Sequence, residues 1–328
     1  TAPAGPGAGN AATGPTSGAN RGIYVDSDLT SWEYCWEFRK DPWLRLRDGL
    51  DLRRALSATD AFLGRVAVAD STLEPPSERE VVDVAVPALV AALEHAEDRD
   101  TVSSCMIALA KIGRDPRGTR LHELFRSRLR SHDQEIRETA ALAIGIARQC
   151  ANDDIELLVA LATDSDAGQR AVARARVDER VRAFACYALG LSLSRLETVR
   201  QPAVVRALVR VLDESATLGS GREIGVAAIA ALAQVPLADD PASAAVRDTA
   251  LGGLVAFYEQ PLGPGSQLIQ AQCPVAIAAL ASGSHPRRHE FCARFGDLLR
   301  NSLRPVEHGE SKTNDHVFQS CAIAIGML

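Results

Sequence analysis

One motif recurs six times between residues 101 and 328, and it constrains the fold more than any other feature of the sequence. The six segments align without gaps: TVSSCMIALAKIG (101–113), IRETAALAIGIAR (136–148), VRAFACYALGLSL (181–193), IGVAAIAALAQV (224–235), QCPVAIAALA (272–281) and VFQSCAIAIGML (317–328). One position is always alanine, and we call it the alanine column: Ala108, Ala143, Ala188, Ala231, Ala279 and Ala324. The next position is always Leu or Ile, and the one after it is always Ala or Gly. Three positions before the alanine column, every segment carries Ala or Cys.

Small residues three or four positions apart lie on one face of an α-helix. Such a face lets a neighbouring helix approach closely, while the Leu or Ile position supplies apolar area that leaves water. The segments are apolar nearly all round, which is typical of helices covered on more than one side. A more amphipathic segment precedes each of them, and the pairs predict helical hairpins. These preceding segments are 81–96, 119–130, 153–163, 201–214, 244–260 and 287–303.

The alanine column repeats at intervals of 35, 45, 43, 48 and 45 residues. These intervals lie around the forty-odd residues of HEAT-type repeats, whereas tetratricopeptide and ankyrin repeats are shorter. We therefore expect an all-α fold, a right-handed α-solenoid of about six HEAT-like hairpins over residues 79–328. The last segment lacks the polar outer face that a terminal repeat needs, so we expect the array to be truncated at its C-terminal end.

The N-terminal quarter has a different composition. Residues 1–21 are rich in Gly, Pro and Ala and carry almost no charge, which predicts a disordered linker. Residues 22–78 include all three tryptophans, and Trp32 and Trp36 share one helical face. We expect this region to form a helical cap over the open end of the solenoid, with an exposed aromatic docking patch as the alternative.

The chain resembles the HEAT family over about residues 79–328. The segment WEYCWEFRKDPWL (32–44), followed by TDAFLG (59–64), resembles a group of bacterial HEAT-repeat proteins. In that group a Gly/Pro-rich leader precedes a WWEFNKD-like block, and the members look exported. This chain departs from the block at Cys35, Trp36 and Arg39. The resemblance implies a location in the periplasm or cell envelope, with the cytoplasm as the alternative, and it implies no activity.

The composition argues against several classes of protein. The net charge of −6 lacks the basic excess of a general nucleic-acid binder. The longest stretch without a charged residue, 260–286, is interrupted by Gly, Pro and Gln, so we expect no insertion into a membrane. The seven cysteines are widely spaced and form no C-x-x-C pair, so they predict buried small hydrophobes instead of a disulfide scaffold or a zinc ribbon.

Few residues suggest catalysis or metal binding. His285, His289 and Cys292 have donor atoms at helix-turn spacing. However, Pro286 predicts a helix start that leaves His285 at the cap, and we expect Cys292 to face the core. The sequence contains no nucleophile elbow, Walker loop or dinucleotide-binding motif. We therefore expect no metal, no cofactor and no enzyme. A HEAT-like bilin lyase remains an alternative, because the chemistry of those enzymes leaves little trace in motifs.

Arginines gather in residues 114–182, where 13 of them accompany 12 acidic residues. This balance is typical of a solvated surface with ion pairs, and a phosphate-binding groove like that of HEAT-like DNA glycosylases is the alternative. We predict a non-catalytic scaffold that binds a protein partner. Its expected contact surface comprises the inner helices of the solenoid and an insert at 164–180. Four arginines, which we expect near the surface, would meet acidic groups of the partner: Arg137, Arg170, Arg174 and Arg182.

Overall fold

The computed structural model of the chain divides into two compact units, Thr1–Pro75 and Pro76–Leu328. The structure describes residues 77–114, 120–147, 152–217, 221–238, 240–262, 267–283, 285–302 and 315–328, all in the second unit. The predicted linker at 1–21 and the predicted aromatic cap at 22–78 lie outside the described residues, except for the last two positions of the cap. Within the described ranges all regular structure is helical, which confirms the all-α prediction.

Each predicted segment contains a helix. The helices at the amphipathic segments, here called first-row helices, are α5 (Val86–His95), α7 (Leu121–Arg128), α9 (Asn152–Ala162), α12 (Gln201–Thr217), α14 (Pro241–Glu259) and α17 (Arg288–Ser302). Those at the recurring motif, the second-row helices, are α6 (Arg99–Ile112), α8 (Gln134–Ile146), α11 (Glu179–Leu193), α13 (Arg222–Leu232), α16 (Cys273–Ala281) and α18 (Asp315–Met327). Two short helices lie between them, α10 (Asp166–Val172) in the predicted insert and α15 (Gln267–Gln270). None of the described helices has the length and apolar character needed to cross a bilayer.

Local signals in the sequence set the helix ends. Asp98, Asp133 and Asp240 are N-caps whose carboxylates accept backbone N–H bonds from the first turn of α6, α8 and α14. Gly113 ends α6 in the left-handed conformation, with φ of 59°, where glycine has no steric penalty. Before α5, the helix α4 (Glu78–Glu80) passes through a π-helical turn, η1 (Val81–Ala85). Pro87 is the second residue of α5, and its missing N–H explains why the regular α-helical hydrogen bonding is interrupted in the preceding turn.

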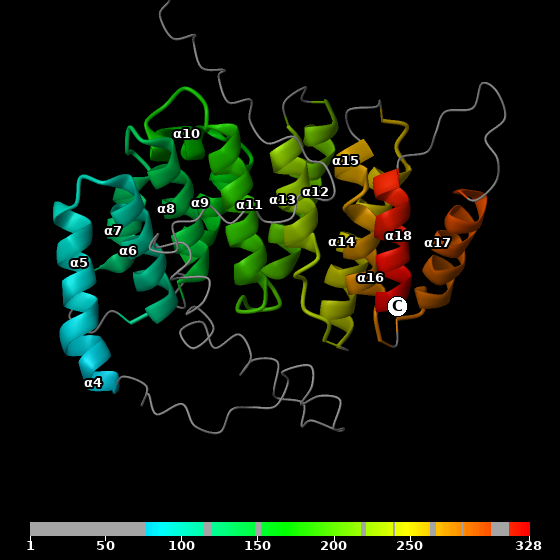
Figure 1. Ribbon diagram of the computed structural model, residues 1–328, viewed down its shortest axis with the longest axis horizontal. Helices are drawn as coiled ribbons and strands as arrows, with labels where there is room; N and C mark the ends of the chain where they lie inside the picture. Colours follow the sequence, from blue (N-terminus) through cyan, green and yellow to red (C-terminus); the bar gives the residue numbers. More distant parts are fainter. Residues whose placement is uncertain are drawn as a thin grey trace, which may run out of the picture. The chain divides into compact units, whose positions relative to one another are not determined.

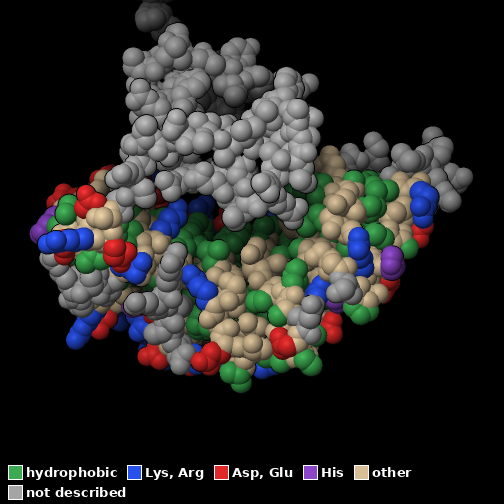
Figure 2. Space-filling model, turned by 90° about the horizontal axis from the view of Figure 1, so that it is seen from below, with side chains coloured by type: hydrophobic (Ala, Val, Ile, Leu, Met, Phe, Trp, Pro, Cys, Tyr) green, Lys and Arg blue, Asp and Glu red, His purple; other side chains and the backbone are tan. Residues whose placement is uncertain are grey.

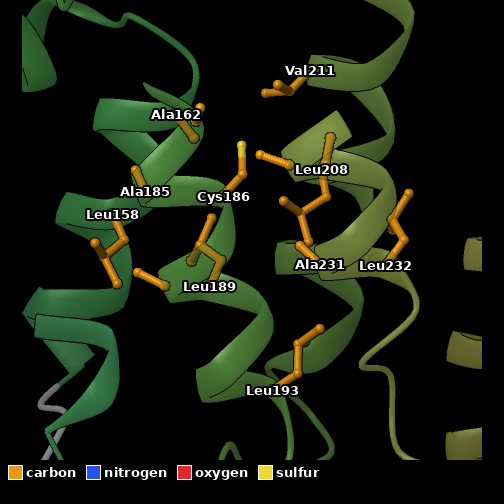
Figure 3. Packing of buried hydrophobic residues seen from close by; sticks show 14 of the residues in the cluster. Leu158, Ala162, Ala185, Cys186, Leu189, Leu193, Leu208, Val211, Ala231 and Leu232 are labelled. Atoms are coloured by element: carbon orange, nitrogen blue, oxygen red, sulfur yellow. The ribbon is translucent and has the colours of Figure 1, made fainter. Parts of the chain in front are cut away.

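The helices pack in chain order (Figure 1). Each second-row helix contacts its first-row partner and also the next second-row helix, from α6 through α8, α11, α13 and α16 to α18. A single cluster of buried apolar residues runs through the described part of the unit. In Figure 3, Leu158 of α9, Cys186 and Leu189 of α11 and Leu208 of α12 belong to this cluster. Complete burial of a side chain such as Leu189 contributes about 1.5–3 kcal/mol to folding.

Glycine allows the closest approach between second-row helices. A Cβ placed at Gly145 of α8 would lie 2.4 Å from the Cα of Ala188 on α11. A Cβ placed at Gly190 of α11 would lie 2.7 Å from the Cα of Ala231 on α13. In both cases, the glycine lies two positions after the alanine-column residue of its own helix, and it contacts the alanine-column residue of the next second-row helix. The recurring small residues thus act as contact points between successive helices.

Candidate protein-interaction surface

Arg137 is buried, which corrects the prediction that it meets a partner. The residue is 2% exposed, and its Nη2 donates to Oδ2 of Asp178 at 2.6 Å, while Nη1 donates to the carbonyls of Ser131 and His132. Asp178 precedes α11, so this ion pair links α8 to the start of the next second-row helix. Four hydrogen bonds from the guanidinium end on internal acceptors, and its burial closes it to another molecule.

Arg182 is also buried, at 4% exposure, so the expectation that it lies near the surface is wrong. Its Nε donates to the carbonyl of Ala162 at 2.9 Å, and its Nη2 lies 3.6 Å from a carboxylate oxygen of Glu214. Ala162 is the last residue of α9, where carbonyls lack an intrahelical partner and a cation is favourable. Arg182 therefore caps a helix inside the protein.

Arg170 and Arg174 are exposed, as predicted, and line one open hollow of about 510 Å³ beside α10. Ala173 ends α10 with φ of 53°, and the N–H of Arg174 donates to the carbonyl of Gln169 at 3.1 Å. This turn brings the two arginines to the same hollow. Among the described residues, no carboxylate forms an ion pair with either guanidinium. Both charges are thus directed to solvent.

The loop that follows α10 is held by Asp164. Its Oδ1 accepts the backbone N–H of Val177 at 2.7 Å, and its Oδ2 lies 3.4 Å from Nε of Arg176. Gln169 of α10 donates its side-chain amide to the Asp164 carbonyl as well. These bonds fix both ends of the insert, so that Arg170 and Arg174 project from a structured element.

A second surface follows the second-row helices, where three hollows share walls. The first, of about 540 Å³, lies over α6, α8 and α11, and it shares Arg180 and Phe184 with the second. The second, of about 340 Å³, lies over α11 and α13, and it shares Arg222 and Val226 with the third. The third, of about 370 Å³, is lined by residues of α13, α15, α16 and α18. We call this continuous feature the second-row groove.

The groove combines an apolar floor with a charged rim. Phe184 and Tyr187 form an edge-to-face pair with ring centroids 6.3 Å apart, and Tyr187 is 36% exposed. On the rim, Arg180 donates to the buried carboxylate of Glu138 at 2.9 Å. Arg222, in contrast, is exposed and forms no ion pair with any residue of the described ranges. Aromatic area beside an available arginine is typical of protein-binding surfaces.

The third hollow holds an unsatisfied polar group. Ser320 is 7% exposed, and its hydroxyl has no hydrogen-bond partner among the residues that the structure describes. Leu268 and Ile323, which also line this hollow, are 44% and 58% exposed. A buried hydroxyl beside exposed apolar side chains suits a ligand that brings both an apolar group and a hydrogen-bonding atom.

Sequence reasoning missed the groove residues, although the alignment contained a signal for them. The position directly before the alanine column is large and apolar in four of the six helices: Ile107, Leu142, Tyr187 and Ile323. Of these four residues, Tyr187 and Ile323 are exposed and line the groove, whereas Ile107 and Leu142 are half-buried and line none of its hollows.

Charges of both signs lie together on the surface. Figure 2 shows Lys and Arg side chains interspersed with Asp and Glu on one face, with apolar side chains between them. In the arginine-rich region, Arg126 pairs with Asp154, and Arg137 and Arg180 pair with carboxylates across successive helices. Each of these three pairs contains one buried side chain, so the pairs stabilise contacts between helices instead of decorating a solvated surface.

Of the three residues considered for metal binding, His285 is buried, Cys292 is half-buried and His289 is exposed. His285 is buried with Nε2 3.4 Å from Asp248 Oδ1, and its Nδ1 accepts the N–H of Arg287 at 3.2 Å. Cys292 is half-buried against the core, whereas Cys186 is fully buried, and its burial raises the thiol pKa to about 12. A thiol with so high a pKa is a poor nucleophile and metal ligand. The described residues contain no cluster of three or more His, Cys, Asp or Glu that could hold a metal ion.

No family model and no curated protein matches the chain. Among solved structures, an engineered protein is similar, with 20% sequence identity and a TM-score of 0.40. The match covers 74% of this chain and 97% of the engineered protein.

Proposed function

We propose that residues 79–328 form a right-handed α-solenoid of HEAT-like hairpins and that this solenoid is a non-catalytic scaffold for a protein partner. Three features support the architecture. Consecutive helices pair, second-row helices contact one another in chain order, and the Gly145–Ala188 contact recurs at Gly190–Ala231. Solenoids of this kind offer long open surfaces, and their usual function is to hold other macromolecules.

The second-row groove carries the functional proposal. Its floor exposes Phe184, Tyr187 and Val226 across two helices, and its rim places Arg222 next to Glu223. An extended polypeptide could lie along the three hollows, with apolar side chains on the floor and acidic groups at Arg222. The net charge of −6 and the paired arginines disfavour a nucleic acid, whose phosphates require a basic surface.

Arg170 and Arg174 extend the proposed contact surface to the insert. Because their guanidinium groups have no carboxylate partner among the described residues, they are available to acidic groups of the partner. Exposed charges of this kind contribute to the rate of association and to specificity more than to affinity.

A pull-down with the full chain from a nuclease-treated extract tests the proposal. We expect a stoichiometric protein partner that is lost with Tyr187→Ala and weakened by the pair Arg170→Glu and Arg174→Glu. The pair Arg206→Glu and Arg210→Glu is the matched control, because both residues are exposed on the first-row helix α12. Equal retention of the partner by all variants would contradict the proposal, and so would a salt-dependent gel shift with nucleic acid at physiological salt.

A further inference from the structure

The two ends of the second-row groove carry opposite charge. Three carboxylates and two guanidinium groups line the first hollow: Asp133, Glu135, Glu138, Arg99 and Arg180. The described residues that line the third hollow include Arg222 and no Asp or Glu. One end of the groove therefore has an excess of negative charge, and the other end has an excess of positive charge.

The negative charge of the first hollow is least compensated at Asp133. Arg180 donates to Oε1 of Glu138 at 2.9 Å, and Nε of Arg99 lies 3.6 Å from Oε2 of Glu135. Asp133 is half-buried, and its Oδ1 accepts backbone N–H groups from the first turn of α8. No Lys or Arg of the described ranges forms an ion pair with it. A basic side chain is therefore favoured over an acidic one at this end.

The third hollow offers donors to an anion. Arg222 is the first residue of α13, and Gly221 before it supplies no side-chain cap to the N–H groups of the first turn. The hydroxyl of Ser320, buried and without a hydrogen-bond partner among the described residues, belongs to the same hollow. A carboxylate in this hollow would gain a hydrogen bond from Ser320 and the charge of Arg222.

The third hollow is formed between α18 and the helices before it. Ser320 lies one helical turn before Ala324, which is buried in the core, so both residues are on the side of α18 that packs against earlier helices. The other walls come from α13, α15 and α16. The donors of this hollow thus belong to the interior of the second row.

The second hollow joins the two charged ends and has an apolar floor. Phe184 and Tyr187 of α11 and Val226 of α13 line it. Glu223 is exposed and lines this hollow together with Arg222, but it does not line the third hollow. A ligand that spans the groove therefore meets a negative, an apolar and a positive region in turn.

The helix spacing sets the distance between the charges of such a ligand. Packed helices lie about 8–10 Å apart, so the two steps from α8 through α11 to α13 span about 16–20 Å. An extended chain covers this distance with about five or six residues. Side chains on one face of an extended chain are an even number of positions apart, so a separation of about six directs both charges into the groove.

We propose that the second-row groove binds an extended segment of the protein partner that carries a basic and an acidic residue about six positions apart, with apolar side chains between them. The basic residue lies in the first hollow, and the acidic residue lies in the third. This inference rests on the proposed function, because it requires the partner to lie along the groove, and it adds the charge pattern of the bound segment. A segment with two like charges would meet repulsion at one end.

The test uses the full chain and three labelled synthetic peptides with blocked termini. The mixed peptide carries lysine, phenylalanine, leucine and glutamate at alternate positions, with threonine between them. The two like-charge peptides carry lysine at both charged positions or glutamate at both. Like-charge peptides are needed because a peptide with the reversed sequence can bind in the opposite direction.

Fluorescence anisotropy at low salt should give the mixed peptide the highest affinity, with each like-charge peptide weaker by about threefold or more. Charge reversal at one end should change the preferred peptide. Arg222→Glu should bind the two-lysine peptide most tightly, and Glu135→Arg should bind the two-glutamate peptide most tightly. Arg206→Glu is the matched control and should keep the preference of the parent chain, because Arg206 is exposed on the first-row helix α12. All three substitutions replace exposed residues, so the thermal midpoint should not change.

The outcomes separate this inference from the proposed function. Equal affinities of the three peptides, all lost with Tyr187→Ala, would overturn the charge pattern and leave the groove as the binding surface. A preference that Arg222→Glu and Glu135→Arg leave unchanged would overturn it as well. Binding that Tyr187→Ala does not weaken, or no binding of any peptide, would contradict the groove itself and with it the proposed function.

Discussion

The junction between α8 and α11 and the insert around α10 are neighbours in the chain, yet they use arginine in opposite ways. At the junction, Arg137 and Arg182 are buried and bonded to Asp178 and to helix-terminal carbonyls. In the insert, Arg170 and Arg174 are exposed and line an open hollow. The location of an arginine therefore depends on whether the fold supplies acceptors for its guanidinium, and not on its hydropathy.

The largest expected effect is at Arg137. Arg137→Ala removes the partner of Asp178 and leaves the carbonyls of Ser131 and His132 without a donor. We expect the free energy of unfolding to fall by about 3 kcal/mol, the lower end of the range for a broken buried pair, because Asp178 is partly exposed. Urea denaturation measures the change. A loss below about 0.5 kcal/mol is the level of an ordinary surface substitution. Such a loss would show that buried Arg137 contributes no more to stability than the exposed arginines of the insert.

A smaller effect is expected from overfilling the junction. Ala188→Leu adds three carbon atoms beside Gly145, where even a Cβ on the glycine would lie 2.4 Å from Ala188. We expect a destabilisation of about 2 kcal/mol from overpacking. Ala175→Leu, at an exposed position of the insert, is the control and should change stability by less than about 0.5 kcal/mol. Equal effects of the two substitutions would show that the junction is not closely packed.

Arg182→Ala should cost slightly less than the overpacked junction. The substitution leaves the Ala162 carbonyl without its side-chain donor, while Glu214, which is 46% exposed, regains water. We expect a loss of about 1–2 kcal/mol in the free energy of unfolding. Arg174→Ala is measured alongside as the exposed counterpart, and a lower midpoint for Arg174→Ala than for Arg182→Ala would reverse the comparison.

The smallest effect on stability is expected in the insert. Replacing Arg170 and Arg174 together with alanine should change the free energy of unfolding by less than about 0.5 kcal/mol, because neither side chain has an ion-pair partner among the described residues. The same variant should slow association with the partner, measured as the on-rate at low salt. A strong destabilisation without a change in the on-rate would contradict this prediction, because it would show that the two arginines stabilise the fold as Arg137 does and do not contact the partner.

The sequence was sufficient to predict the helices because their signal is local and periodic. Alanine, Leu or Ile, and a small residue recur at fixed offsets, and each such segment contains a helix. Whether each arginine is buried or exposed was harder to predict, because ion pairs such as Arg137–Asp178 join residues 41 positions apart. One signal was available. Arg137 and Arg182 occupy the same position of the motif, six residues before the alanine column, and α6 and α16 carry Val102 and Cys273 there, both buried.

The candidate site was predicted only in part. The exposure of Arg170 and Arg174 followed from the charged insert, but the groove depends on how the second-row helices from α6 to α18 are placed side by side. Arg222 and Phe184 come together only through the contact of α11 with α13, which alignment of the motif does not describe. Tertiary packing therefore determines the binding surface, whereas local periodicity determines the helices.

Hydrogen–deuterium exchange of the full chain, alone and with its captured partner, tests the scaffold most directly. We expect the partner to protect backbone amides in residues 179–187, in residues 222–226 and in the insert at 166–176, because these segments contain the groove floor and the exposed arginines. The first-row helix α12, Gln201–Thr217, should exchange at the same rate in both states. Protection of α12 without protection of residues 179–187 would contradict the proposal that the partner binds along the second row.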